Sequence, residues 1–122
     1  MGHVAEPSDV VTQLLASWNQ RDATSFASLF SATAEYASGR GDTYVGRTEI
    51  RRLVSQADPL APVTLVGAPD IQRSGTAAIV TFGWSLGGQK QARRGGVITC
   101  ELTFGSETGW QIERLHNLEA PE

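Results

Sequence analysis

The sequence predicts an α+β protein in which three N-terminal helices pack on a strongly curved antiparallel β-sheet and leave an internal pocket. Two observations support this. Apolar residues in the first half recur at the spacing of an amphipathic helix, whereas residues after position 62 alternate between apolar and polar types, as strands with one buried face do. Helices that precede a run of strands favour an arrangement in which the helices cover one face of the sheet.

Composition limits the class of protein. The 122 residues, 40% hydrophobic and 19% charged, suit one globular domain over 1–122 with a core from 8 to 118. A net charge of -3 disfavours a nucleic-acid partner. A single cysteine excludes an internal disulfide, and no apolar run has the length of a membrane span. Because the N-terminus lacks a signal-peptide pattern, we expect a cytoplasmic protein without a membrane partner.

Three helices are expected before position 59. The first starts at Pro7, with Ser8 or Asp9 as its N-cap, and carries one apolar stripe. The second spans 23–30 with Asp22 as its cap. The third starts at Arg47 or Thr48 and stops before Pro59. The stripe of the first helix consists of Val10, Val11, Leu14, Leu15 and Trp18.

Strands are expected over 33–38, 43–45, 63–69 and 76–86. The polar, glycine-flanked segment 87–96 is expected to be a loop. The hairpin Val97–Asn117 follows, with its turn between Gly105 and Gly109. In its first strand, alternation places Ile98, Cys100, Leu102 and Phe104 on the inner face.

The second strand of the hairpin contains the leading functional candidates. Trp110 sets the inner face, and the same alternation carries Arg114 and His116 inward, which predicts that the strand leaves the core and enters a cavity. A bulge near Glu113 would reverse this and turn Leu115 and Asn117 inward instead.

His116 is the candidate catalytic residue, because an imidazole can act as acid or base near neutral pH. The alternative is a histidine that holds the rim of the pocket by a hydrogen bond. Arg114 would orient an anionic or carbonyl ligand, or else pair with Glu101 or Glu113. Asn117 would donate to a ligand carbonyl or simply end the strand.

Aromatic side chains supply the expected walls of the pocket. Trp18 and Tyr36 would line it with one indole and one hydroxyl, whereas Trp84 is interpreted as ordinary core. Cys100 has apolar neighbours and is interpreted as a buried thiol against the pocket. His3 is the only other histidine, so no metal site is expected, and the glycine-rich segments lack phosphate-loop spacing, so no cofactor is expected.

Three segments resemble a known group of proteins. The segments 15–30 and 44–50 resemble the opening of nuclear transport factor 2-like domains, and 109–117 resembles their SnoaL-like branch. That branch includes small accessory proteins of enediyne and polyketide biosynthesis. The resemblance implies a cone-shaped fold with a mixed sheet. It does not imply one activity, because the superfamily contains isomerases, cyclases, hydrolases and binding proteins.

The catalytic residues of ketosteroid isomerases with this fold are absent from the matching positions. The catalytic tyrosine falls on Leu14, the general base on Ser38 and the late aspartate near Cys100. The acid–arginine–acid set of limonene-type epoxide hydrolases is not found on inward strand positions either. The absence of these catalytic residues disfavours the reaction mechanisms known for ketosteroid isomerases and limonene-type epoxide hydrolases.

Three functions remain open. The first is binding of a small apolar organic ligand, polyketide-like by the resemblance, in an accessory role. The second is a cofactor-free isomerase, cyclase or hydrolase using His116. The third is a homodimeric interaction module that pairs through the outer sheet face, where Thr99, Glu101 and Thr103 would lie.

Overall fold

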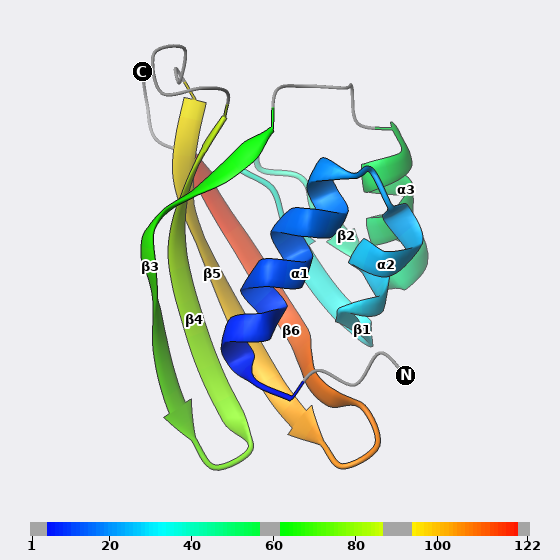
Figure 1. Ribbon diagram of the computed structural model, residues 1–122. Helices are drawn as coiled ribbons and strands as arrows, with labels where there is room; N and C mark the ends of the chain where they lie inside the picture. Colours follow the sequence, from blue (N-terminus) through cyan, green and yellow to red (C-terminus); the bar gives the residue numbers. More distant parts are fainter. Residues whose placement is uncertain (1–4, 57–61, 87–93, 120–122) are drawn as a thin grey trace.

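Three helices cover one face of a six-stranded mixed sheet in the computed structural model, which describes residues 5–56, 62–86 and 94–119 (Figure 1). The helices are α1 (Pro7–Asn19), α2 (Ala23–Ser28) and α3 (Arg47–Gln56). The strands are β1 (Phe30–Ala37), β2 (Thr43–Val45), β3 (Val63–Ser74), β4 (Ala77–Leu86), β5 (Arg94–Gly105) and β6 (Gly109–Glu119). The predicted loop 87–96 lies mostly outside the described residues, and β5 begins within its last part.

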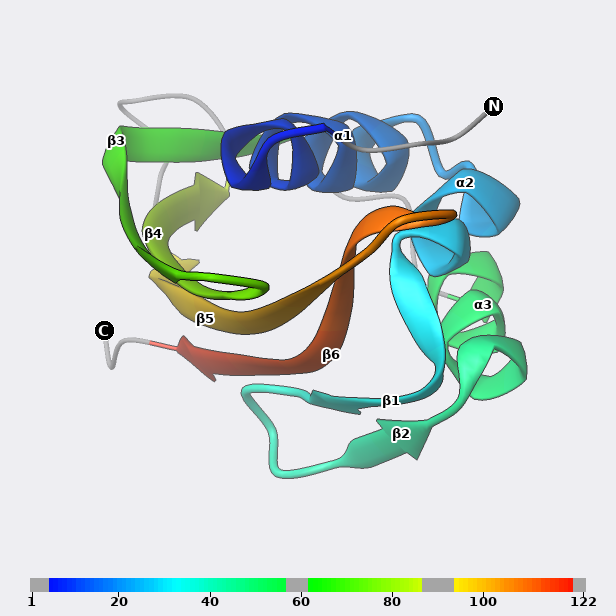
Figure 2. The ribbon, with the colours of Figure 1, turned by 90° about the horizontal axis from the view of Figure 1, so that it is seen from below.

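The sheet has the order β2-β1-β6-β5-β4-β3. Only β1 and β6 pair in parallel among the described strands; the other neighbours are antiparallel, so the sheet is mixed. It is not strongly curled, which corrects the expected strong curvature: β2 and β3 remain separate edges. Figure 2 shows α1 above β4 and β5, with α2 and α3 beside β1.

Local signals explain where the helices begin. Pro7 is the first residue of α1, a position where its missing N–H costs no hydrogen bond, and the N-cap is Glu6 without a side-chain bond. The predicted caps Ser8 and Asp9 are therefore wrong. Asp22 caps α2 as predicted: its carboxylate accepts from the Ser25 hydroxyl at 2.7 Å and the Ser25 N–H at 3.1 Å, which holds the pKa of Asp22 below its usual range.

The second helix is shorter than predicted. It ends at Ser28, and Phe30, which was expected in the helix, begins β1. Phe30 is completely buried and packs at 5.5 Å, ring centre to ring centre, against Phe26. Both residues are apolar, so the sequence did not distinguish a helix end from a strand start here.

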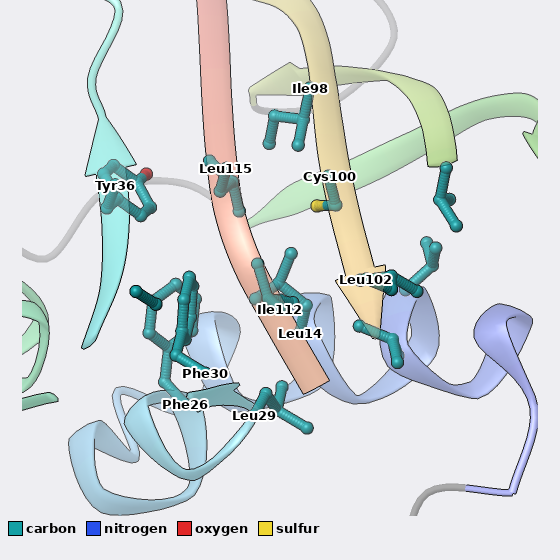
Figure 3. Packing of buried hydrophobic residues seen from close by; sticks show 14 of the residues in the cluster. Leu14, Phe26, Leu29, Phe30, Tyr36, Ile98, Cys100, Leu102, Ile112 and Leu115 are labelled. Atoms are coloured by element: carbon teal, nitrogen blue, oxygen red, sulfur yellow. The ribbon is translucent and has the colours of Figure 1, made fainter. Parts of the chain in front are cut away.

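The core lies between the helices and the inner face of the sheet (Figure 3). Alternation along β4 places Ala78, Val80, Phe82 and Trp84 on one face of the strand, and all four are buried. The predicted hairpin is confirmed as β5 and β6, with Gly109 at a positive φ of 72°.

A bulge at Glu113 interrupts the pairing of β5 with β6. Leu102 pairs with Ile112 but Glu101 pairs with Arg114, so Glu113 is the extra residue. Its carboxylate accepts one hydrogen bond from the Ser31 hydroxyl at 2.8 Å and another from the Thr103 hydroxyl at 2.7 Å. The two bonds tie the bulge to strands on both sides of β6.

Removal of this carboxylate should destabilise the fold. We expect Glu113→Ala to lower the free energy of unfolding by about 2 kcal/mol, because two hydrogen bonds to a charged group are lost and the buried Ser31 hydroxyl loses its partner. Urea denaturation measures this difference.

Glu101→Ala is the matched control. The Glu101 side chain is 54% exposed and faces Arg114 at 3.7 Å, so its removal should change the free energy of unfolding by less than about 0.5 kcal/mol. Equal losses in the two variants would contradict a structural role for the Glu113 bonds.

Candidate functional site

A cavity of about 380 Å³ lies between the helices and the inner face of the sheet. Its volume is within the range of small-molecule sites. Side chains from α1, α2, α3 and all six strands converge on it, because each element presents its inner face to the same interior. The apolar wall includes Leu14, Leu15, Trp18, Phe26, Leu53, Trp84, Ile98 and Leu115.

The end of α1 is fixed to the start of β3 beside this cavity. The Asn19 side-chain amide donates to the Val63 carbonyl at 2.9 Å, and its oxygen accepts from the Val63 N–H at 2.8 Å. Both backbone groups of Val63 are thereby satisfied by one side chain. Trp18, the residue before Asn19, lines the cavity, packs on Phe26 at 5.6 Å between ring centres and lies under the Arg21 guanidinium.

Two polar side chains enter the apolar wall from neighbouring strands. Asn117 on β6 lines the cavity, and its Oδ1 accepts from Trp84 Nε1 at 2.9 Å. Tyr36 on β1 is 7% exposed and also lines the cavity. Burial, with smaller contributions from Cys100 and Tyr44, raises the pKa of the Tyr36 phenol well above its usual value. The phenol is therefore a proton donor in hydrogen bonds, not a base, near neutral pH.

The polar rim of the cavity comes from the turn between β1 and β2 and from the end of β6. The Ser38 hydroxyl accepts from the backbone N–H groups of Arg40 at 3.3 Å and Asp42 at 3.2 Å, which shapes the turn. Gly39 lies so close to Glu119 that an added Cβ would be 3.1 Å from the Glu119 Cβ. Ser38, Gly39, Arg40, Asp42 and Glu119 all line the cavity.

Three of the predicted ligand-binding residues line this cavity. They are Trp18, Tyr36 and Asn117, brought together from α1, β1 and β6. Their binding role stays a prediction. Cys100 is not among the lining residues; it is 1% exposed in the core, and burial raises the pKa of its thiol well above the usual value.

The predicted inward orientation of Arg114 and His116 is wrong. The bulge at Glu113 shifts the alternation by one residue, so Leu115 and Asn117 face the cavity while Arg114 and His116 are exposed on the outer face. This is the alternative that the sequence left open. Figure 3 shows Leu115 on β6 within the core cluster beside β1 and β5.

Arg114 pairs with carboxylates on both neighbouring strands. Its Nε lies 3.8 Å from Glu35 and its Nη1 lies 3.7 Å from Glu101. These distances are long and the side chains are about half exposed, so the pairs contribute little stability. The alternative expectation, that Arg114 pairs with Glu101 or Glu113, is confirmed for Glu101.

Trp84 lines the cavity, although the sequence interpretation assigned it to the ordinary core. It is buried, as that interpretation implied, but it also lines the cavity and binds the Asn117 amide. The signal that could have found it is the chemistry of the indole, which needs an acceptor when it is buried.

No group of three or more His, Cys, Asp or Glu side chains within 5–56, 62–86 and 94–119 is placed to hold a metal ion. Among the helices that the structure describes, none is long and apolar enough to cross a membrane.

No protein-family model and no curated protein sequence matches this chain. Solved structures do match. A cystatin-like domain of unknown function from Nostoc punctiforme superposes with a TM-score of 0.80 at 28% identity, over 94% of this chain and 75% of that one. An NTF2-like superfamily protein from Salmonella enterica serovar Typhimurium superposes with a TM-score of 0.78 at 19% identity, over 94% and 89% of the two chains.

A third structure, from Parabacteroides distasonis, is described as a candidate ketosteroid isomerase. It superposes with a TM-score of 0.75 at 14% identity, over 94% of this chain and 89% of that one. Likeness at this level of identity concerns the arrangement of helices and strands. The chain therefore has a cystatin-like fold, and its arrangement of helices and strands is similar to that of an NTF2-like superfamily protein.

Proposed function

We propose that this protein binds a small, mainly apolar organic molecule in the cavity between its helices and its sheet. The observation that carries the proposal is the cavity itself: it measures about 380 Å³, and it has an inner wall of aromatic and aliphatic side chains and a polar rim. Sites for small organic molecules have this composition, because apolar contact supplies affinity and a few polar groups supply orientation.

The residues of this chain at the positions matching the catalytic residues of ketosteroid isomerases support ligand binding over an isomerase reaction. Two of the three matching positions, Leu14 and Ser38, line the cavity, and the third, Cys100, is buried in the core. None supplies a carboxylate. The resemblance of the C-terminal segment to SnoaL-like proteins makes a polyketide-like molecule, and an accessory role in its biosynthesis, the finer form of this proposal.

An enzymatic role for His116 receives no support from its position. The residue is exposed on the outer face, where it pairs in register with Thr99 on β5 and Ala37 on β1. A ligand in the cavity would be separated from the imidazole by the sheet. Ligand binding in the cavity would therefore not depend on the His116 imidazole.

Filling the cavity should abolish binding. In a thermal-shift titration we expect acetylnaphthalene to raise the Tm of the wild type by several degrees, since a ligand at about 100 times its Kd stabilises the folded state by roughly 2.7 kcal/mol. Leu15 is a half-buried residue of the cavity wall, so the larger indole in Leu15→Trp should fill the cavity and remove this Tm shift. Circular dichroism checks that the variant folds.

His116→Ala is the control, and its Tm shift should equal that of the wild type. Absence of any shift with the wild type, over a panel of apolar ketones and hydrocarbons of this size, would contradict the proposed function. Loss of the shift in His116→Ala alone would instead place the ligand on the outer face.

A second candidate function, a homodimeric interaction module, is favoured by an exposed apolar row on the outer face. Val66, Gly83, Val97 and Leu118 pair in register across β3, β4, β5 and β6. Val66 is 54%, Val97 44% and Leu118 65% exposed. A contiguous apolar row across four strands would be buried by a second copy of the chain.

If the chain forms this dimer, a charge on the outer face of β3 should disrupt it, whereas a charge on the opposite face of the same strand should not. Val66→Lys should convert a dimer to a monomer, because it places a charge in the apolar row. Ile71→Lys is the matched control: Ile71 is 38% exposed in the same strand, but it pairs with the buried Val80 and so belongs to the opposite face. Sedimentation velocity measures both. A wild type that stays monomeric at high concentration would contradict this candidate.

A further inference from the structure

The indole of Trp84 fixes which end of the Asn117 amide faces the cavity. An indole N–H can only donate, so the amide atom 2.9 Å from it must be the oxygen. The Asn117 Nδ2 group, with two hydrogens, is then directed away from Trp84. No described residue accepts a hydrogen bond from it. The cavity wall therefore presents an amide donor, and the amide acceptor is already used.

A second donor lies on the adjacent strand. Tyr36 pairs in register with Leu115, and Asn117 is two residues further along β6, so both polar side chains project from the same inner face. The Tyr36 hydroxyl makes no hydrogen bond with any described residue. Because burial keeps the phenol protonated, this hydroxyl can donate to a ligand.

The surroundings favour a neutral acceptor over a charged one. Leu14, Phe26, Ile98 and Leu115 line the same cavity as the two donors, and so does the carboxylate of Glu119. An anion there would lose its hydration on the apolar surface and be repelled by that carboxylate. The cation among the described lining residues, Arg40, is exposed in the turn at the rim.

We propose that the Tyr36 hydroxyl and the Asn117 amide together donate hydrogen bonds to a carbonyl oxygen of the ligand, so that the cavity selects ketone- or quinone-type molecules over hydrocarbons of the same shape. This inference rests on the proposed binding function and names its ligand class. A carbonyl oxygen has two lone pairs and can accept both donors at once. Trp84 is a positioning residue, since it acts only through the orientation of Asn117.

The test compares the ketone acetylnaphthalene with ethylnaphthalene, which replaces its carbonyl by a methylene group. Their Kd values are measured by isothermal titration calorimetry. We expect the wild type to bind the ketone about tenfold more tightly, because the hydrocarbon leaves two donors unpaired. Tyr36→Phe and Asn117→Leu should each reduce this ratio to about threefold or less, while the Kd for ethylnaphthalene changes little.

Trp84→Phe tests the positioning role. It removes the indole donor, frees the amide to rotate and should lower the ketone-to-hydrocarbon ratio, whereas loss of packing alone would weaken both probes equally. His116→Ala should keep the wild-type ratio.

The outcomes separate the two proposals. Equal affinity of the wild type for both probes would overturn the carbonyl inference and leave the binding function standing. A wild-type preference that survives both Tyr36→Phe and Asn117→Leu would also overturn it. Failure of both probes to bind would overturn the binding function together with the inference.

Discussion

The bulge at Glu113 is the constraint on which the candidate site depends. It inserts one residue into β6 between Ile112, which packs in the core, and Leu115, which lines the cavity. Side chains in a strand alternate strictly between faces, so one extra residue exchanges the two faces for the remainder of the strand. The cavity consequently receives Leu115 and the amide of Asn117 instead of a guanidinium and an imidazole.

The bulge is stabilised by side chains on both neighbouring strands. Ser31 on β1 and Thr103 on β5 each donate to one oxygen of the Glu113 carboxylate. Glu113 is therefore both the residue that interrupts the alternation of side chains in β6 and the residue whose hydrogen bonds hold the bulge in place. The two hydrogen bonds also link β6 to its parallel neighbour β1 and to its antiparallel neighbour β5.

Much of the fold could be predicted from the sequence because it depends on periodicity. The stripe of α1, the cap at Asp22 and the inner face of β4 follow from spacing and local chemistry. The boundary between α2 and β1 could not be located, because Phe30 is apolar in either structure. The degree of sheet curvature depends on pairing between distant strands, which periodicity does not report.

The candidate site was harder to predict, and the reason is the same bulge. Trp18 and Tyr36 could be placed at the cavity because Trp18 belongs to the apolar stripe of the first helix and Tyr36 is an aromatic residue of a short strand, and both line the cavity. Arg114 and His116 were placed on the wrong face because the prediction continued the alternation through Glu113. Glu113 forms a bulge and is hydrogen-bonded to Ser31, which is 82 residues away in the chain. Asn117 was a candidate on chemical grounds, but its orientation depends on Trp84.

The most direct test of this account is the rate of thiol modification at two adjacent positions of β6. Leu115→Cys and His116→Cys are treated with a thiol reagent in the folded state, and native Cys100, 1% exposed, gives a low background. The bulge predicts fast modification in the His116→Cys variant and slow modification in Leu115→Cys. Slow modification in His116→Cys with fast modification in Leu115→Cys would show uninterrupted alternation and contradict the account.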